Sequence, residues 1–181
     1  MGNMNRKIAN KELDRLTHDE FINSDKTPIG IVLDNIRSQH NIGSVFRTSD
    51  AFRIESIMLC GISATPPNNE IHKTALGSEL TVAWKHFTNT ADAIMYLKNE
   101  GYIILSLEQT EKKIFLHEFQ PEKNKKYALV FGNEVKGVAQ SIIDISDSCI
   151  EIPQLGTKHS LNVSVSVGIV VWDFVSKMKQ L

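Results

Sequence analysis

Three polar segments of this chain each follow a short apolar run and carry side chains that could bind a ligand or act on one. A guanidinium is suited to a phosphate or to a developing oxyanion, while amide, hydroxyl and carboxylate groups orient a substrate through hydrogen bonds. The segments and their candidate residues are DNIRSQHNIGSVFRTSDAF at 34–52 with Asn41 and Arg47, VFGNEVKGV at 130–138 with Glu134, and IEIPQLGTKHSLNVSVS at 150–166 with Ser160 and Asn162.

The first segment places Arg47 on a helix that we expect over about 42–53. Asn41 stands where an N-cap would, and Gly43 allows the backbone to approach another surface closely. Arg47 has two explanations of similar weight. It could form a surface ion pair with Asp50 or Glu55, or it could face a phosphate or an oxyanion.

The second segment ends a buried strand at Gly132 and has a second glycine at Gly137. Its Gly-x-x-x-x-Gly spacing resembles a phosphate loop, but Val138 stands where that loop requires Lys, so we reject it. No strand is followed by the Gly-x-Gly-x-x-Gly pattern of dinucleotide-binding proteins. The ordinary explanation of Glu134 is a carboxylate stabilised by the dipole of a helix start.

The third segment combines two periods. Ser160, Asn162 and Ser164 alternate with apolar residues as in a strand, but from Val163 onward the apolar residues recur every three or four positions, as on a helix. The length of this run favours a C-terminal helix, with Ser160 or Asn162 capping its start.

The elements that must position these side chains alternate between strands and helices, which predicts an α/β fold with a mostly parallel sheet flanked by helices. Ligands of open parallel sheets bind beyond the carboxyl ends of the strands, so the turns after Asp34, Glu108, Gly132 and Pro153 are the candidate positions. The predicted strands are 29–34, 56–61, 81–87, 102–108, 126–132 and 149–153; the predicted helices are 42–53, 90–99, 138–145 and the C-terminal helix.

The chain ends are predicted to differ in character. Residues 6–22 are charged, with apolar residues loosely spaced as on a helix, so we expect an N-terminal helical extension over 1–25 and one domain over 26–181. No segment has the length of apolar sequence that spans a bilayer, and the N-terminus has no apolar signal core, so we expect a cytoplasmic protein.

The composition fits one domain with a hydrophobic core, since 41% of the 181 residues are hydrophobic and 23% are charged. Cys60 and Cys149 are far apart and are expected in the core, and no histidine spacing predicts a metal site. A net charge of −1 neither indicates nor excludes nucleic-acid binding, and the lysines at 122–127 are interpreted as a solvated loop.

Together, NIGSVFRTSDAF, VFGNEVKG and IPQLGTKHSLNVSVS resemble, in the same order, the three motifs of the SpoU (TrmH-like) RNA ribose 2′-O-methyltransferases of the SPOUT superfamily. The resemblance runs from the first strand to the C-terminal helix. It implies an α/β fold with a C-terminal trefoil knot, S-adenosyl-L-methionine as cofactor, and a homodimer whose interface completes the active site. It also implies RNA as the substrate. We expect no DNA partner and, from the lack of a long apolar segment, no membrane.

The resemblance also implies roles for individual residues. Arg47 would favour an alkoxide-like transition state at the ribose 2′-OH, because a guanidinium stays protonated and is a poor base. The residues implied as catalytic are Asn41, Arg47, Glu134, Ser160 and Asn162, and those implied as cofactor-binding are Leu107, Gly132, Ile152 and Leu161.

Three questions stay open at this level. Relatives that act on tRNA and on rRNA share these motifs, and the lack of a separate N-terminal RNA-binding domain slightly favours tRNA. A knotted methyltransferase acting on a base is one alternative, although Ser160 and Asn162 before the last helix argue for ribose. A non-catalytic RNA-binding module on the same fold is the other.

Overall fold

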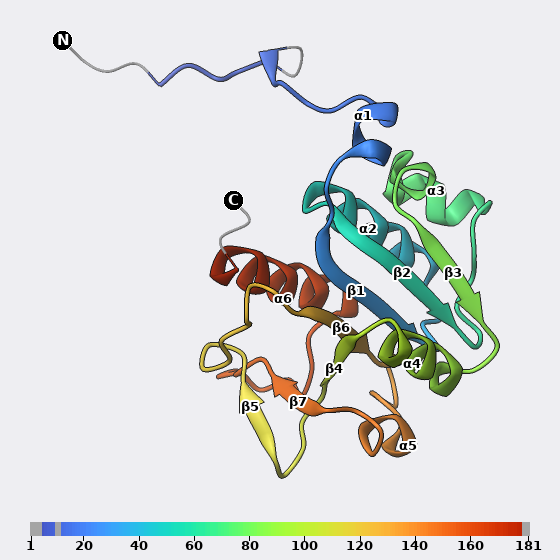
Figure 1. The fold of residues 1–181 in the computed structure, drawn as a ribbon, viewed down its shortest axis with the longest axis vertical. Helices are drawn as coiled ribbons and strands as arrows, with labels where there is room; N and C mark the ends of the chain where they lie inside the picture. The colour runs from blue at the N-terminus through green and yellow to red at the C-terminus, as the bar shows by residue number, and fades with distance from the viewer. Residues whose placement is uncertain (1–4, 10–11, 179–181) are drawn as a thin grey trace.

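A seven-stranded parallel sheet forms the centre of the computed structural model, which describes residues 5–9 and 12–178. Every pair of neighbouring strands is parallel. The strands are β1 (Thr27–Asp34), β2 (Ile54–Cys60), β3 (Trp84–Phe87), β4 (Tyr102–Leu107), β5 (Lys113–Phe115), β6 (Lys126–Phe131) and β7 (Ser148–Glu151). Their order across the sheet is β3-β2-β1-β6-β4-β7-β5 (Figure 1).

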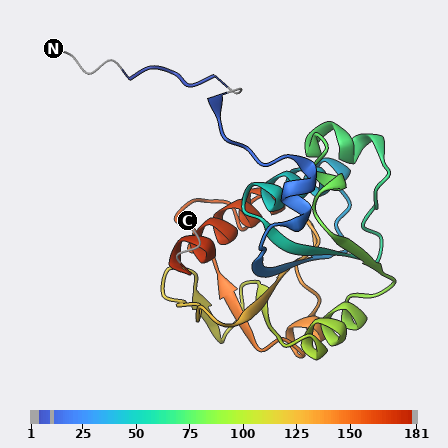
Figure 2. The ribbon, with the colours of Figure 1, turned by 45° about the horizontal axis from the view of Figure 1, so that its top comes forward.

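Helices cover both faces of the sheet, as the sequence predicts (Figures 1 and 2). In β1, Ile31 and Leu33 pack in the core cluster that includes residues of α2, α3 and α6, whereas Val32 packs in the cluster with α4 and α5. This alternation gives the sheet two buried faces, as expected for a parallel sheet. The helices are α1 (His18–Asn23), α2 (Gln39–Ala51), α3 (Asn69–Ala75), α4 (Thr90–Asn99), α5 (Gln140–Ile143) and α6 (Val163–Lys177), with a 3₁₀ turn at Ser78–Leu80.

Two elements were not predicted. The edge strand β5 lies where the sequence suggested a loop, because three residues are too short to show a strand period. Helix α3 follows the Pro66-Pro67 loop, and its N-cap is Asn68, whose side chain accepts hydrogen bonds from the N–H groups of Glu70 and Ile71. That capping residue was the available sequence signal for the helix.

The N-terminal helix is much shorter than predicted. Thr17 and Glu20 form a capping box that starts α1, and only Phe21 of this helix is buried. The described residues before Thr17 are exposed and non-helical apart from a short turn, and they extend from the body of the domain (Figure 2). A longer helix over these exposed residues would have no packing to stabilise it. Residues 1–4 and 10–11 lie outside the described part of the chain, and the boundary at residue 26 stays a prediction.

Helix α6 has the amphipathic character predicted from its sequence. Asn162 is its N-cap and accepts a hydrogen bond from the Ser164 N–H at 2.9 Å. One side of the helix is buried in the core, and the other leaves an exposed apolar row. We call this row the α6 stripe; it consists of Leu161, Val165, Ile169 and Trp172.

Both cysteines are buried as predicted, and burial raises the pKa of the Cys60 thiol to about 12. None of the helices within the described residues has the length and apolar character needed to cross a membrane.

Candidate active site

A cavity of about 600 Å³ lies beyond the carboxyl ends of β4, β6 and β7. The last residues of these strands, Leu107, Phe131 and Glu151, all line it. This is the edge at which open parallel sheets bind ligands. The turn after β1 has a structural role instead, because the buried Asp34 carboxylate accepts a hydrogen bond from the Thr90 hydroxyl at the start of α4.

All four residues expected to bind the cofactor line this cavity. Leu107 ends β4, Gly132 follows β6, Ile152 follows β7, and Leu161 precedes α6. They come from four separate chain segments, and each is placed by the end of a strand or the start of a helix. The fold therefore brings the predicted cofactor residues to one place, while their roles stay predictions.

The loop at 132–138 is a closed turn with little freedom. Asn133 and Gly137 exchange two backbone hydrogen bonds, of 3.1 and 2.9 Å, and the Asn133 side chain accepts from the N–H groups of Val135 and Lys136. A Cβ on Gly132 would lie 2.1 Å from the carbonyl carbon of Gly137. Only glycine fits at position 132 because the two ends of the loop touch.

Glu108 is a site residue that the motif comparison did not identify. Its Oε2 accepts a hydrogen bond from the Val138 N–H at 2.9 Å, and its Oε1 accepts from the Gln109 N–H at 2.8 Å. Gly137 has a positive φ of 67°, and a Cβ there would lie 2.1 Å from Glu108 Oε2. Glu108 thus ties the base of the loop to the end of β4. Its position at the end of a predicted strand was the signal that could have identified it.

Glu134 ties the other end of the same loop to the start of α2. Its carboxylate accepts hydrogen bonds from the N–H groups of Arg37 and Ser38, both at 3.2 Å, and from the Asn41 side-chain amide at 3.3 Å. Partial burial acts to raise the pKa of Glu134, but hydrogen bonds from its own N–H and from these three groups outweigh it and hold the pKa below its ordinary value. The expected helix-dipole contact is therefore present, but to the N-terminus of α2, since no helix begins at Glu134 itself.

Asn41 and Asn162 connect the first motif to the third. The Asn162 side-chain amide donates to Asn41 Oδ1 at 3.2 Å, and Asn41 in turn donates to Glu134. The prediction that Asn41 caps α2 is wrong: Ser38 is the N-cap, and its hydroxyl accepts from the Asn41 N–H. Asn41 lies in the first turn of the helix, so its side chain is free to link the other two motifs.

Ser160 lies in an open wall of the cavity. It lines the cavity together with Gln154 and His159, and the described segment at 153–161 is mostly exposed. Gln109 donates from its side-chain amide to the His159 carbonyl at 3.1 Å. Leu155 in this segment is fully exposed, although it is apolar.

Two predicted site residues do not line the cavity: Asn41, which contacts the lining residues Glu134 and Asn162, and Arg47, which contacts neither. Arg47 is exposed on α2 and lines a second hollow of about 470 Å³ with Ser44, Thr48, Ala51, Phe52, Lys73 and Thr74. The surface ion pair considered for it is not formed: Asp50 accepts from the Thr81 hydroxyl, and Glu55 pairs with Lys126. Within the described residues, Arg47 forms no ion pair.

The cavity suits a nucleoside-sized cofactor. Its volume lies within the range of small-molecule sites, and it combines apolar side chains with the backbone of a glycine turn. Leu161 at its rim is 39% exposed, which leaves apolar surface for a ligand to cover. No group of three or more His, Cys, Asp or Glu side chains among the described residues is arranged to hold a metal ion.

The fold and the cavity define an α/β protein with a ligand site at the carboxyl edge of a parallel sheet. The model of the SpoU rRNA Methylase family matches residues 28–172, so the chain belongs to this family. An uncharacterized tRNA/rRNA methyltransferase of Borreliella burgdorferi is 31% identical over 182 residues, covering 99% of this chain and 76% of that protein. The 23S rRNA (guanosine-2′-O-)-methyltransferase RlmB of Neisseria meningitidis is 31% identical over 153 residues, which cover 84% of this chain and 60% of RlmB.

Solved structures confirm the predicted fold class. The TrmH/SpoU tRNA modifying enzyme of A. aeolicus has a TM-score of 0.76 and 26% identity, covering 90% of this chain and 80% of that one. The SpoU methyltransferase AviRb of Streptomyces viridochromogenes, crystallised with AdoMet, has a TM-score of 0.75 over 88% of this chain and 62% of its own. At 18% identity, AviRb supports the fold alone.

Proposed function

We propose that this protein transfers a methyl group from S-adenosyl-L-methionine to a ribose 2′-OH of tRNA or rRNA, acting in the cytoplasm. The observation that supports this most is the chain of hydrogen bonds from Glu134 through Asn41 to Asn162, which joins the three motifs beside the cavity. The relatives' names, which include a 2′-O-methyltransferase of 23S rRNA, support the same reaction. We also propose that the C-terminal part of the chain forms the trefoil knot that the family resemblance implies.

The cavity residues divide the work of holding the cofactor. Leu107, Ile152 and Leu161 would cover its apolar surface, and the backbone at Gly132 would approach it closely because no side chain intervenes. When bound, the cofactor supplies an electrophilic methyl group on a sulfonium. The protein's task is then to hold the ribose hydroxyl in line with that group, and alignment of this kind can lower a barrier by about 7–11 kcal/mol in favourable cases.

Arg47 must reach a cavity that it does not line, and a second copy of the chain can supply it. The α6 stripe runs from Leu161 at the rim of the cavity to Trp172, whose ring contacts Phe52 of the second hollow at 6.0 Å between centroids. The four side chains of the stripe are each 38–54% exposed. We propose that two copies pair through this stripe in a homodimer.

A twofold axis across the stripe would set the cavity end of one copy against the Trp172 end of the other, because an isologous interface pairs the two ends reciprocally. Each cavity would then receive Arg47 from the partner subunit. Its guanidinium would stabilise the charge that develops as the 2′-OH loses its proton. Asn41, Ser160 and Asn162 would orient the reacting groups, and Glu134 would hold the loops in place.

The test is methyl transfer from labelled S-adenosyl-L-methionine to unmodified tRNA and rRNA transcripts, followed by nuclease digestion and mass spectrometry. We expect the label on a ribose. Label on a base would overturn the assignment of the 2′-OH. Tight cofactor binding without transfer to total RNA from a deletion strain would favour a non-catalytic RNA-binding module.

A further inference from the structure

The second hollow has a composition that the proposed reaction does not fully use. Besides Arg47 it contains Lys73 and three hydroxyl-bearing residues, and Phe52 forms an apolar side. We propose that this hollow binds a backbone phosphate of the substrate RNA. In the free protein the Glu70 carboxylate pairs with Lys73, and the phosphate displaces it on binding. The inference rests on the proposed function, and it names Lys73 as an RNA-binding residue.

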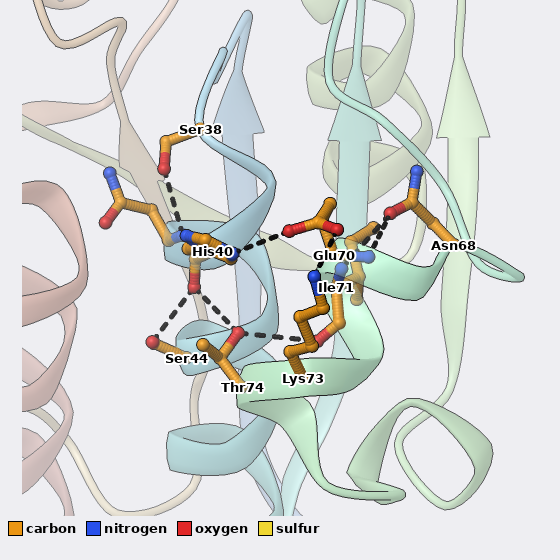
Figure 3. A network of polar contacts seen from close by, with 9 residues as sticks. Ser38, His40, Ser44, Asn68, Glu70, Ile71, Lys73 and Thr74 are labelled. Carbon is orange, nitrogen blue, oxygen red and sulfur yellow. Dashed lines mark hydrogen bonds and ion pairs between the residues drawn. The ribbon is translucent and has the colours of Figure 1, made fainter.

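The hollow is rigid because α2 and α3 are locked together along one seam (Figure 3). The hydroxyls of Ser44 and Thr74 both donate to the His40 carbonyl, at 2.9 and 3.0 Å. A Cβ on Gly43 would lie 2.1 Å from Thr74 Oγ1, so the close approach predicted for this glycine is present. The backbone that carries Lys73 is therefore fixed relative to the backbone that carries Arg47.

The two cations of the hollow are open to solvent. Arg47 is exposed, and the Lys73 side chain is 62% exposed. A lysine ammonium binds phosphate as a compact point charge, and an arginine can bind two phosphate oxygens at once. Two such cations fit a phosphate diester better than they fit a neutral ligand. The Ser44 and Thr74 hydroxyls already donate to the His40 carbonyl, so the charges of Arg47 and Lys73 carry the recognition.

Glu70 takes the place of that anion in the free protein. Its Oε1 accepts from Lys73 Nζ at 2.6 Å, and its Oε2 lies 2.9 Å from His40 Nε2 (Figure 3). Hydrogen bonds from Lys73 and His40 lower the pKa of Glu70, so its carboxylate is charged at neutral pH. Exposed ion pairs of this kind are weak, so a phosphate bound also by Arg47 can compete for Lys73.

The lysines at 123–126 offer a weaker case for the same role. Lys126 pairs with Glu55, and none of these lysines lines either the cavity or the second hollow. The hollow, in contrast, lies beside the end of the α6 stripe, where the proposed dimer sets the cavity of the partner subunit. A phosphate held there would belong to a nucleotide next to the one that is methylated.

The experiment compares variants in RNA binding and turnover with in vitro transcribed tRNA and rRNA fragments. Lys73→Ala should raise Kd and KM for RNA by about three- to tenfold and reduce the slope of log Kd against log salt by about 1, as loss of one phosphate contact does. Cofactor affinity and kcat should stay near wild type. Lys73→Arg should restore most of the RNA affinity, which separates charge from a general structural effect.

Glu70→Gln gives the sharper result, because removing the competing carboxylate frees Lys73. We expect RNA affinity to rise by about two- to fivefold, the size of a weak exposed ion pair. Lys98→Ala is the matched control: Lys98 also pairs with an acid, Asp147 at 3.4 Å, but it lies on α4, across the sheet from α2 and α3. It should leave RNA binding unchanged.

The outcomes separate this inference from the proposed function. If the wild-type protein methylates RNA but Lys73→Ala keeps its RNA affinity and salt slope, the phosphate site is wrong and the enzyme assignment stands. Weaker RNA binding by Glu70→Gln would also overturn it. A wild-type protein that neither binds nor methylates these RNAs would overturn both.

Discussion

The loop at 132–138 and the segment at 153–161 line the same cavity, but the first is tied down by side chains and the second is mostly exposed. Glu108 holds one end of the loop, Glu134 holds the other, and Asn133 closes its middle. The segment at 153–161 receives one side-chain hydrogen bond within the described part of the chain, from Gln109. One wall is thus closed within the chain itself, and we propose that a ligand or a partner subunit completes the other.

Arg47→Ala should have the largest effect on methyl transfer, because its guanidinium is proposed to stabilise the charge that develops at the ribose 2′-OH. We expect methyl transfer to fall by about 10²–10³-fold, as when one preorganised stabilising group is lost. Tm should change little, since Arg47 forms no ion pair among the described residues. Cofactor affinity should also change little, since Arg47 is proposed to face the ribose hydroxyl and not the cofactor. Single-turnover rates measure methyl transfer, and calorimetry measures cofactor affinity and Tm. Unchanged turnover would remove Arg47 from the chemistry.

Gly137→Ala should have the next largest effect, on the complete wall. The substitution places a Cβ at a positive φ of 67° and against the Glu108 carboxylate, so we expect a loss of about 1–3 kcal/mol in unfolding free energy. Cofactor affinity should fall as well, because the loop lines the cavity. Urea denaturation and isothermal titration are the measurements.

Gly156→Ala is the matched control in the other wall. No atom lies within 4 Å of a Cβ built there, and its φ is not in the positive range. The unfolding free energy should change by less than about 0.5 kcal/mol. Equal losses of unfolding free energy in Gly137→Ala and Gly156→Ala would show that the loop at 132–138 is no more tightly packed than the segment at 153–161.

How much of this the sequence could predict depends on whether a residue acts through local or distant contacts. The α6 helix and its Asn162 cap follow from apolar spacing and a capping residue. The convergence of Leu107 and Leu161 on one cavity came only from the family resemblance and from the rule for strand ends. The Asn41–Glu134 contact joins residues 93 positions apart, and no local pattern specifies such a pair.

The errors have the same origin. Asn41 was predicted to be a cap because its type and place fit one, but Ser38 occupies that position, which leaves the Asn41 side chain free for Asn162. Glu108 belongs to no motif that was recognised, and its role depends on a loop whose turn is set by Gly137. Arg47 lies outside the cavity of its own chain, which no reading of one sequence could reveal.

Glu134→Gln should have a smaller effect that depends on pH. Glu134 is only slightly buried and its carboxylate still contacts solvent, so replacing its charged hydrogen bonds should cost about 0.5–1 kcal/mol at neutral pH. Because the folded-state pKa lies below the ordinary value of 4.5, the contribution is fully present above pH 4.5 and is lost as the pH falls through the folded pKa. The wild type and the variant should therefore converge in stability on acidification, measured by denaturation at a series of pH values. A gap that stays constant down to the acid transition would show that the charge of Glu134 is not what holds the loop.

Leu155→Ser should have the smallest effect on the free chain. The side chain is fully exposed, so no packing is lost and the unfolding free energy should stay within about 0.5 kcal/mol of wild type.

Hydrogen exchange compares the two walls along the backbone. Without ligand, amides at 153–161 should exchange faster than those at 132–138, and they should slow when S-adenosyl-L-methionine is added. A drop in Tm for Leu155→Ser, or slow exchange at 153–161 in the ligand-free protein, would mean that this wall is already packed. The cavity would then be complete in one chain, and Arg47 could reach it only by movement of α2.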